Sequence, residues 1–162
     1  MQSVVDSVAQ RAVSYRSPGW CRMRLTGLLV AACLAGCAVR PITPPNLYQR
    51  LGGTGGLMLI VDEALARSLT DERIAARFEG VETHQLKRLM VAQLCQRTGG
   101  GCQYLGRDMR RAHEGRGIRG REFEAFLQHV SAAMERFRVP RKEQEELLAL
   151  LEKDRRDVIV AR

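Results

Sequence analysis

Beyond Pro45, apolar residues recur about every 3.6 positions, and no stretch alternates between apolar and polar residues as a half-buried strand would. This periodicity predicts an all-α fold whose helices are separated by glycine-rich corners. The expected helices span residues 46–50, 57–69, 70–78, 83–98, 108–114 and 123–137, with one more helix after Pro140.

Two local features refine this picture. The run Gly52–Gly56 (GGTGG) is expected to end the first helix, since glycine is a poor helix former. His84 and His129 fall away from the apolar stripes of their helices, which predicts that both face solvent. His113 lies one turn after Met109 and shares a face with it, an arrangement that by itself is more typical of a core histidine than of a ligand.

Composition narrows the class of protein. The chain has 162 residues, of which 45% are hydrophobic and 27% charged, so one folded domain is expected rather than a disordered or multi-pass membrane protein. The formal net charge is +8. Arginines are frequent between residues 107 and 121, but acidic residues are interspersed and no aromatic residues alternate with them. A solvated basic face near lipid headgroups is therefore expected rather than a nucleic-acid site. No hydrolase, P-loop, zinc or paired-carboxylate motif is present.

The N-terminus reads as a bacterial targeting segment. From Met23, which is an alternative start, a basic beginning leads into an apolar run that is too short to span a bilayer. The run ends in Leu34-Ala35-Gly36-Cys37, which resembles a lipobox. We therefore expect residues 1–36 to be removed and Cys37 to be acylated, which would anchor the protein on the periplasmic face of a membrane. Residues 37–46 would form a Pro-rich tether. A plain signal peptide is the alternative.

The remaining cysteines are expected to pair. Without residues 1–36, and with Cys37 acylated, only Cys95 and Cys102 remain. An oxidising compartment favours a disulfide, which would close a loop of eight residues and stabilise the fold by about 2.5 kcal/mol on the chain-entropy estimate. Two free thiols are the alternative.

An ordered set of motifs in residues 47–160 resembles the group I truncated hemoglobins. The matching segments are Leu47–Gly53, Val61–Glu63, Phe78–Gly80, Thr98–Gly100, Tyr104–Met109, His113–Ile118, Val139–Pro140 and Asp157–Val160. No single segment is diagnostic, but their order is specific. The resemblance implies a two-over-two helical sandwich that binds haem b.

The resemblance also implies roles for single residues. His113 becomes the proximal iron ligand, a role that needs a neutral imidazole whose second nitrogen donates to an acceptor, usually a backbone carbonyl. Phe78 matches an aromatic that packs on the haem face, Met109 a proximal porphyrin contact, and Tyr104 a residue at the haem edge.

On the distal side the sequence departs from the family pattern. Leu65 stands where a tyrosine commonly hydrogen-bonds the gas ligand, and Leu86 and Met90 match positions that are often polar. An apolar distal site is therefore expected, which speeds O₂ release and favours CO and NO. Gln93 is expected to be a hydrogen-bonded buried amide rather than a donor to the gas.

The partner of the haem propionates is left open. Leu89 replaces the basic residue that the family commonly places beside them. The candidates that could take over this role are Lys87, Arg88, Arg107 and Arg110.

Three functions follow from this sequence. The first is an exported, membrane-anchored haem globin that reversibly binds a diatomic gas (O₂, NO or CO). The second is a haem electron-transfer or NO-detoxifying protein, with Met90 as an alternative second iron ligand and a reductase as partner; an NO dioxygenase or a peroxidase-like enzyme belongs here. The third is a helical interaction module that has kept the globin scaffold without the haem.

Overall fold

A computed structural model describes residues 43–159 of the chain. The targeting segment 1–36, the alternative start Met23 and Cys37 lie outside these residues. Within them all regular structure is helical, as expected, and none of the helices is long and apolar enough to cross a membrane. The helices are α1 (Leu47–Arg50), α2 (Gly53–Thr70), the 3₁₀ helix η1 (Ala75–Phe78), α3 (Thr83–Arg97), α4 (Met109–His113), α5 (Gly120–Arg136), α6 (Arg141–Glu152) and α7 (Arg155–Val158).

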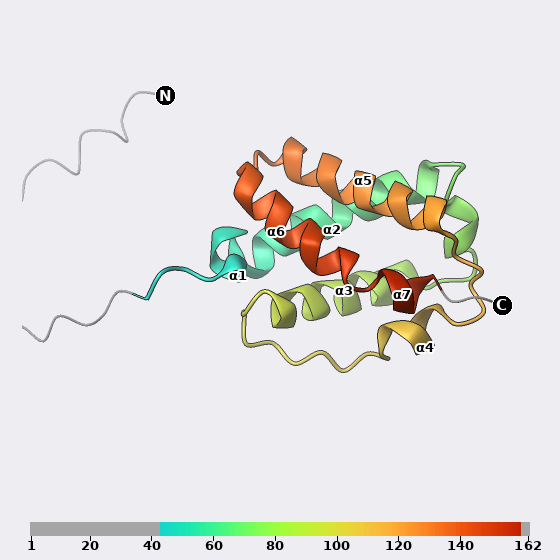
Figure 1. Ribbon diagram of the computed structural model, residues 1–162, viewed down its shortest axis with the longest axis horizontal. Coiled ribbons are helices and arrows are strands. Elements are labelled where there is room, and N and C mark those ends of the chain that lie inside the picture. Colours follow the sequence, from blue (N-terminus) through green and yellow to red (C-terminus); the bar gives the residue numbers. More distant parts are fainter. Residues whose placement is uncertain (1–42, 160–162) are drawn as a thin grey trace, which may run out of the picture. The chain divides into compact units, whose positions relative to one another are not determined.

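Two pairs of long helices build the domain. α2 packs against α3 and also against α5, and α5 packs in turn against α6 (Figure 1). The short helices close the arrangement, because α1 contacts α2 and α6 while α7 contacts α4 and α5. Leu57, Ile60, Met134 and Leu147 lie fully buried where these helices meet. The arrangement is the expected two-over-two sandwich.

The glycine run 52–56 follows the end of α1, as expected, but it also contains the start of α2. Gly52 has a left-handed backbone (φ 86°) and precedes α2, which starts at Gly53 and not at residue 57 as predicted. Inside α2, a Cβ atom at Gly56 would lie 1.8 Å from the carbonyl oxygen of Leu51. Glycine is therefore required at position 56 by the close approach of another backbone segment, which helix propensity does not reveal.

Two other helix boundaries differ from the prediction. The helix expected over residues 70–78 is reduced to η1, since α2 continues through Thr70 and the chain then becomes extended at Asp71. The last helix is divided into α6 and α7. At the division, Arg97 pairs with Asp154 and donates to the carbonyl of Leu150 at 2.6 Å, which satisfies a C-terminal acceptor of α6 from outside the helix.

Cys95 and Cys102 form a disulfide in the structure, with their Cα atoms 5.7 Å apart. Cys95 is fully buried near the end of α3, and Cys102 lies partly buried in the loop that leads toward α4. The bond therefore fixes the start of that loop against the core.

The prediction that His129 faces solvent is wrong, whereas His84 is exposed as expected. His129 is only 9% exposed, because α2 and the residue after it supply polar partners. Its Nδ1 lies 3.0 Å from Oγ of Ser68, and its Nε2 lies 2.9 Å from Oδ2 of Asp71. Hydrogen bonds from Arg73, with a smaller contribution from His129, hold the pKa of Asp71 well below its usual range. These partners lie about 60 positions away in the sequence, so the helix pattern alone could not reveal them.

Neighbouring glycines in α2 provide a matched test of this packing. Gly56→Ala should destabilise the domain by about 1–3 kcal/mol, because its methyl group would overlap the Leu51 carbonyl. Gly55→Ala should stabilise it by about 0.5–1 kcal/mol, because a Cβ at position 55 meets no atom within 4 Å and alanine favours the helix. Urea unfolding of both variants measures the difference. Equal effects of the two substitutions would contradict the described approach of Leu51 to α2.

Candidate functional site

A cavity of about 680 Å³ opens among α2, η1, α3, α4, α5 and α7, a volume within the range of small-molecule and cofactor sites. Its walls are mainly apolar. The residues that line the cavity include Ile60, Val61, Ala64, Arg77, Phe78, Leu86, Met90, Gln93, Tyr104, Leu105, Arg107, Met109, His113, Arg116 and Glu122. The space between the helices is thus open, which disfavours the third function, a scaffold that has lost its cofactor site.

His113 enters this cavity from the last position of α4. The helix is short because Asp108 caps its start, accepting from the backbone N–H of Arg111 at 3.0 Å, and because Gly115 turns the chain with φ 74° soon after its end. Nδ1 of His113 lies 2.7 Å from the carbonyl oxygen of Met109. A carbonyl can only accept, so Nδ1 carries the proton and Nε2 keeps a lone pair for a metal.

Six of the seven expected haem contacts line this one cavity: Phe78, Leu86, Met90, Tyr104, Met109 and His113. The exception is Leu65, which is 3% exposed, belongs to the hydrophobic core and does not line the cavity. The adjacent residue Ala64, with Ile60 and Val61, forms the α2 wall instead. Position 65 lies about 100° around the helix from position 64, so the two side chains leave α2 in different directions.

Two polar side chains in the cavity, Gln93 and Tyr104, already form hydrogen bonds within the protein. Nε2 of Gln93 donates to Sδ of Met109 at 3.1 Å, which matches its expected role as a hydrogen-bonded amide. The hydroxyl of Tyr104 donates to the carbonyl of Arg107 at 2.7 Å. Burial, with a smaller contribution from Asp108, raises the pKa of Tyr104, so this phenol remains a neutral donor at physiological pH. Leu86 and Met90 offer no N–H or O–H donor.

Arginines line part of the cavity wall, but most of them are not the candidates that the sequence suggested as partners of the haem propionates. Of the four expected cationic candidates, only Arg107 lines the cavity, and it forms no ion pair with any residue of 43–159. Lys87 pairs with Asp62, and Arg110 pairs with Asp157 at 2.9 Å. Arg88 is exposed and is not part of the cavity wall.

Sequence reasoning missed two further cavity arginines, Arg77 and Arg116. Arg77 is held in place by Glu122, which is 2% exposed and lies 3.1 Å away. Burial alone would raise the pKa of Glu122, but hydrogen bonds from backbone N–H groups and from Arg77 lower it, so the buried carboxylate stays charged. The signal available in the sequence was the position of Arg77 directly before Phe78, an expected haem contact.

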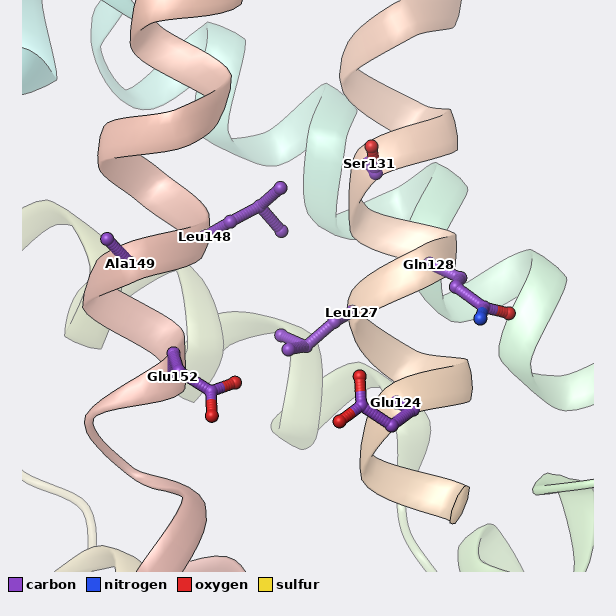
Figure 2. A pocket seen from close by; sticks show the side chains of 7 residues that line it. All are labelled: Glu124, Leu127, Gln128, Ser131, Leu148, Ala149 and Glu152. Atoms are coloured by element: carbon purple, nitrogen blue, oxygen red, sulfur yellow. The ribbon is translucent and has the colours of Figure 1, made fainter. Parts of the chain in front are cut away.

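A second hollow lies on the outside of α5 and α6, where Leu127 and Leu148 face each other (Figure 2). Glu124 and Glu152 border it, and both carboxylates pair with Arg155. The hollow contains no histidine, cysteine or unpaired carboxylate, so we regard the cavity beside His113 as the candidate functional site.

Comparison with known sequences identifies relatives of the chain. Residues 46–159 match the family model described as "Bacterial-like globin". The chain is 30% identical over 112 residues to the group 1 truncated hemoglobin GlbN of Mycolicibacterium paratuberculosis, an alignment that covers 69% of this chain and 82% of the relative. It is 35% identical over 99 residues to the GlbN of Synechocystis sp., covering 59% and 80% of the two chains.

Solved structures agree with the fold. The truncated hemoglobin of Tetrahymena pyriformis in its Fe(III) form superposes with a TM-score of 0.69 at 23% identity, covering 72% of this chain and all of that one. The 2/2 hemoglobin of Synechococcus sp., solved in the cyanomet state with covalently attached heme, gives 0.67 at 25% identity, covering 71% and 98%. Together with the cavity and its histidine, these matches show that the chain belongs to the bacterial-like globins, as a group I truncated hemoglobin.

Proposed function

We propose that this globin holds haem b in the cavity through His113 and reversibly binds a diatomic gas. The observation that carries the proposal is the hydrogen bond from Nδ1 of His113 to the Met109 carbonyl, since it leaves Nε2 as the nitrogen available to iron inside the cavity. The cavity suits the rest of the cofactor. Phe78 and Met109 offer apolar surface for a porphyrin, and Arg107, with Arg77 and Arg116, offers positive charge for its two propionates.

The protein side chains would set the properties of the site. When bound, haem supplies an iron coordination position for O₂, NO or CO. The Met109 carbonyl fixes the His113 ring and makes its Nε2 a stronger ligand. Apolar walls from α2 and α3 keep water away from the ligand position.

The absence of a distal donor distinguishes this site from a tight O₂ store. Among the described residues, Val61, Ala64, Leu86 and Met90 carry no N–H or O–H on their side chains, and Gln93 and Tyr104 each donate to another group of the protein. The remaining amide of the α3 wall, Gln85, is exposed to solvent. One hydrogen bond to O₂ is worth roughly 1–2 kcal/mol, or about 5–30-fold in affinity. We therefore propose rapid O₂ release and a preference for CO and NO, which disfavours O₂ storage and efficient NO dioxygenation.

Electron transfer with His113 and Met90 as paired ligands is the second candidate. Met90 lines the cavity, but it also packs against the hydrophobic core, as expected for an ordinary apolar residue. The gas-binding function is therefore favoured. A five-coordinate ferrous absorption spectrum supports gas binding, whereas a six-coordinate low-spin spectrum supports ligation by Met90.

Export and lipid anchoring are proposed from the sequence alone, since Cys37 lies outside the described residues. Expression of the full chain in a bacterium should give a membrane-associated protein whose N-terminal peptide begins at an acylated Cys37, measured by mass spectrometry. Cys37→Ser should release the protein from membranes or leave the precursor uncleaved. An unmodified Cys37 within an uncleaved wild-type chain would contradict this proposal.

His113→Ala tests the ligand assignment. Loss of the imidazole should abolish haem retention, measured as the Soret absorbance that survives gel filtration after haem is added, because the iron would lose its protein ligand. His84→Ala is the matched control, since His84 is exposed and lies outside the cavity wall, and it should retain haem fully. Retention of haem by His113→Ala with an unchanged spectrum would refute the assignment.

Leu86→Gln tests the distal side. A glutamine amide on the cavity wall should slow O₂ release about 5–30-fold by donating a hydrogen bond to the ligand. Leu86→Met adds no donor at similar volume and should change the rate little. Stopped-flow measurement of the O₂ dissociation rate compares the two. If both substitutions changed the rate equally, polarity would not be the controlling property of this wall.

A further inference from the structure

The positive charge of the described domain is concentrated in one short segment. Residues 107–121 contain six arginines and two carboxylates, a net charge of +4. The whole of residues 43–159 has 20 basic and 17 acidic side chains, a net charge of +3. The domain outside the segment therefore carries a net charge of −1, and the excess positive charge belongs to α4, its flanking loops and the first turn of α5.

These six arginines, which we call the basic face, are all exposed: Arg107, Arg110, Arg111, Arg116, Arg119 and Arg121. On α4, Met109, Ala112 and His113 line the cavity, whereas Arg110 and Arg111 are exposed to solvent. Because α4 is a single helix about 10 Å thick with its side chains, Arg110 and Arg111 lie within one helix thickness of the His113 side of the cavity. Arg107 and Arg116 line the cavity itself.

Leu105 gives the basic face an apolar point of contact. It is 80% exposed, the most exposed of the large apolar side chains in the described region, and it belongs to the cavity mouth together with Arg107. An exposed apolar residue beside several arginines is a common composition for a protein-binding surface, in which arginine is enriched.

We propose that the basic face docks an acidic protein that donates one electron to the haem. This inference rests on the proposed function, because the ferrous iron needed to bind O₂ is open to oxidation in an apolar pocket and has to be reduced again. In the step, one electron leaves the reduced donor, which is thereby oxidised, and the haem iron passes from Fe(III) to Fe(II). No atom or proton is transferred.

An acidic protein fits this surface better than a lipid bilayer. Anionic headgroups attract exposed arginines by electrostatics alone, but a headgroup cannot supply the electron that oxidised haem needs. Leu105 is also the single large apolar side chain exposed between residues 104 and 121 that could enter a bilayer. Arg110, Arg111 and Arg121 already face Asp157, Asp108 and Glu122 at 2.9–3.5 Å. Exposed pairs of this kind are worth little, so carboxylates of a partner can replace them.

The test uses the full chain in neutral detergent, with reduced flavodoxin, an acidic flavoprotein, as the probe. Arg111→Glu with Arg119→Glu reverses two exposed charges that lie outside the cavity wall, so the site itself should be unaffected. The matched control is Arg141→Glu with Lys142→Glu, at the exposed start of α6, the end of the domain away from α4 (Figure 1). Binding is measured by calorimetry, and electron transfer by formation of the ferrous CO spectrum.

The basic-face variant should weaken binding and slow reduction about tenfold or more at low ionic strength, whereas the control changes neither by more than about twofold. The difference should shrink as the ionic strength rises from about 0.01 M to about 0.15 M. Equal effects of the two variants or unchanged reduction by the basic-face variant would each overturn the proposal. So would binding to phosphatidylglycerol vesicles that is weakened by the basic-face substitutions and not by the control, with no binding of flavodoxin. Failure to hold haem would be visible in the absorption spectrum before the probe is added, and so is distinguishable from failure to dock.

Discussion

The hydrogen bond from Nδ1 of His113 to the backbone carbonyl of Met109 is the contact on which the site depends. It joins the first and last residues of α4, so the same helical turn that forms the element also sets the tautomer of the imidazole. The cap at Asp108 fixes where α4 begins, and the left-handed turn at Gly115 prevents the helix from continuing far beyond His113. Local backbone structure thereby presents an imidazole with an available Nε2 to the cavity, while the long helices contribute the space beside it.

The two sides of the cavity differ in polarity and in charge. Toward α2 and α3 its wall is mainly aliphatic, and Gln93 and Tyr104 each donate a hydrogen bond within the protein. Toward α4 and η1 its mouth is cationic, with Arg107, Arg77 and Arg116. Such a division suits a cofactor that has an apolar ring and acidic side groups.

Much of the fold was readable from local pattern. Apolar residues at helical spacing predicted the long helices α3 and α5, and the order of short motifs pointed to the globin sandwich that the structure has. The errors share one cause, which is that the deciding partner lies elsewhere in the chain or in space. Gly56 is required by the carbonyl of Leu51, and His129 is buried because Ser68 and Asp71 meet it. Leu65 was expected in the cavity from family position, but the rotation of α2 gives that wall to Ala64.

The sequence by itself determined the helical class and the family, because periodicity and motif order are local properties. Motif order also singled out His113, which the structure places at the cavity. Only the tertiary structure decided which residues form the distal wall and which arginines reach the cavity. Arg77 and Arg116 are 39 positions apart, and their common position at the cavity depends on how η1 lies against the loop between α4 and α5, where Arg77 donates to the Arg116 carbonyl. The direction in which a side chain leaves a packed helix is set by the fit between helices, and no single segment of the chain encodes that fit.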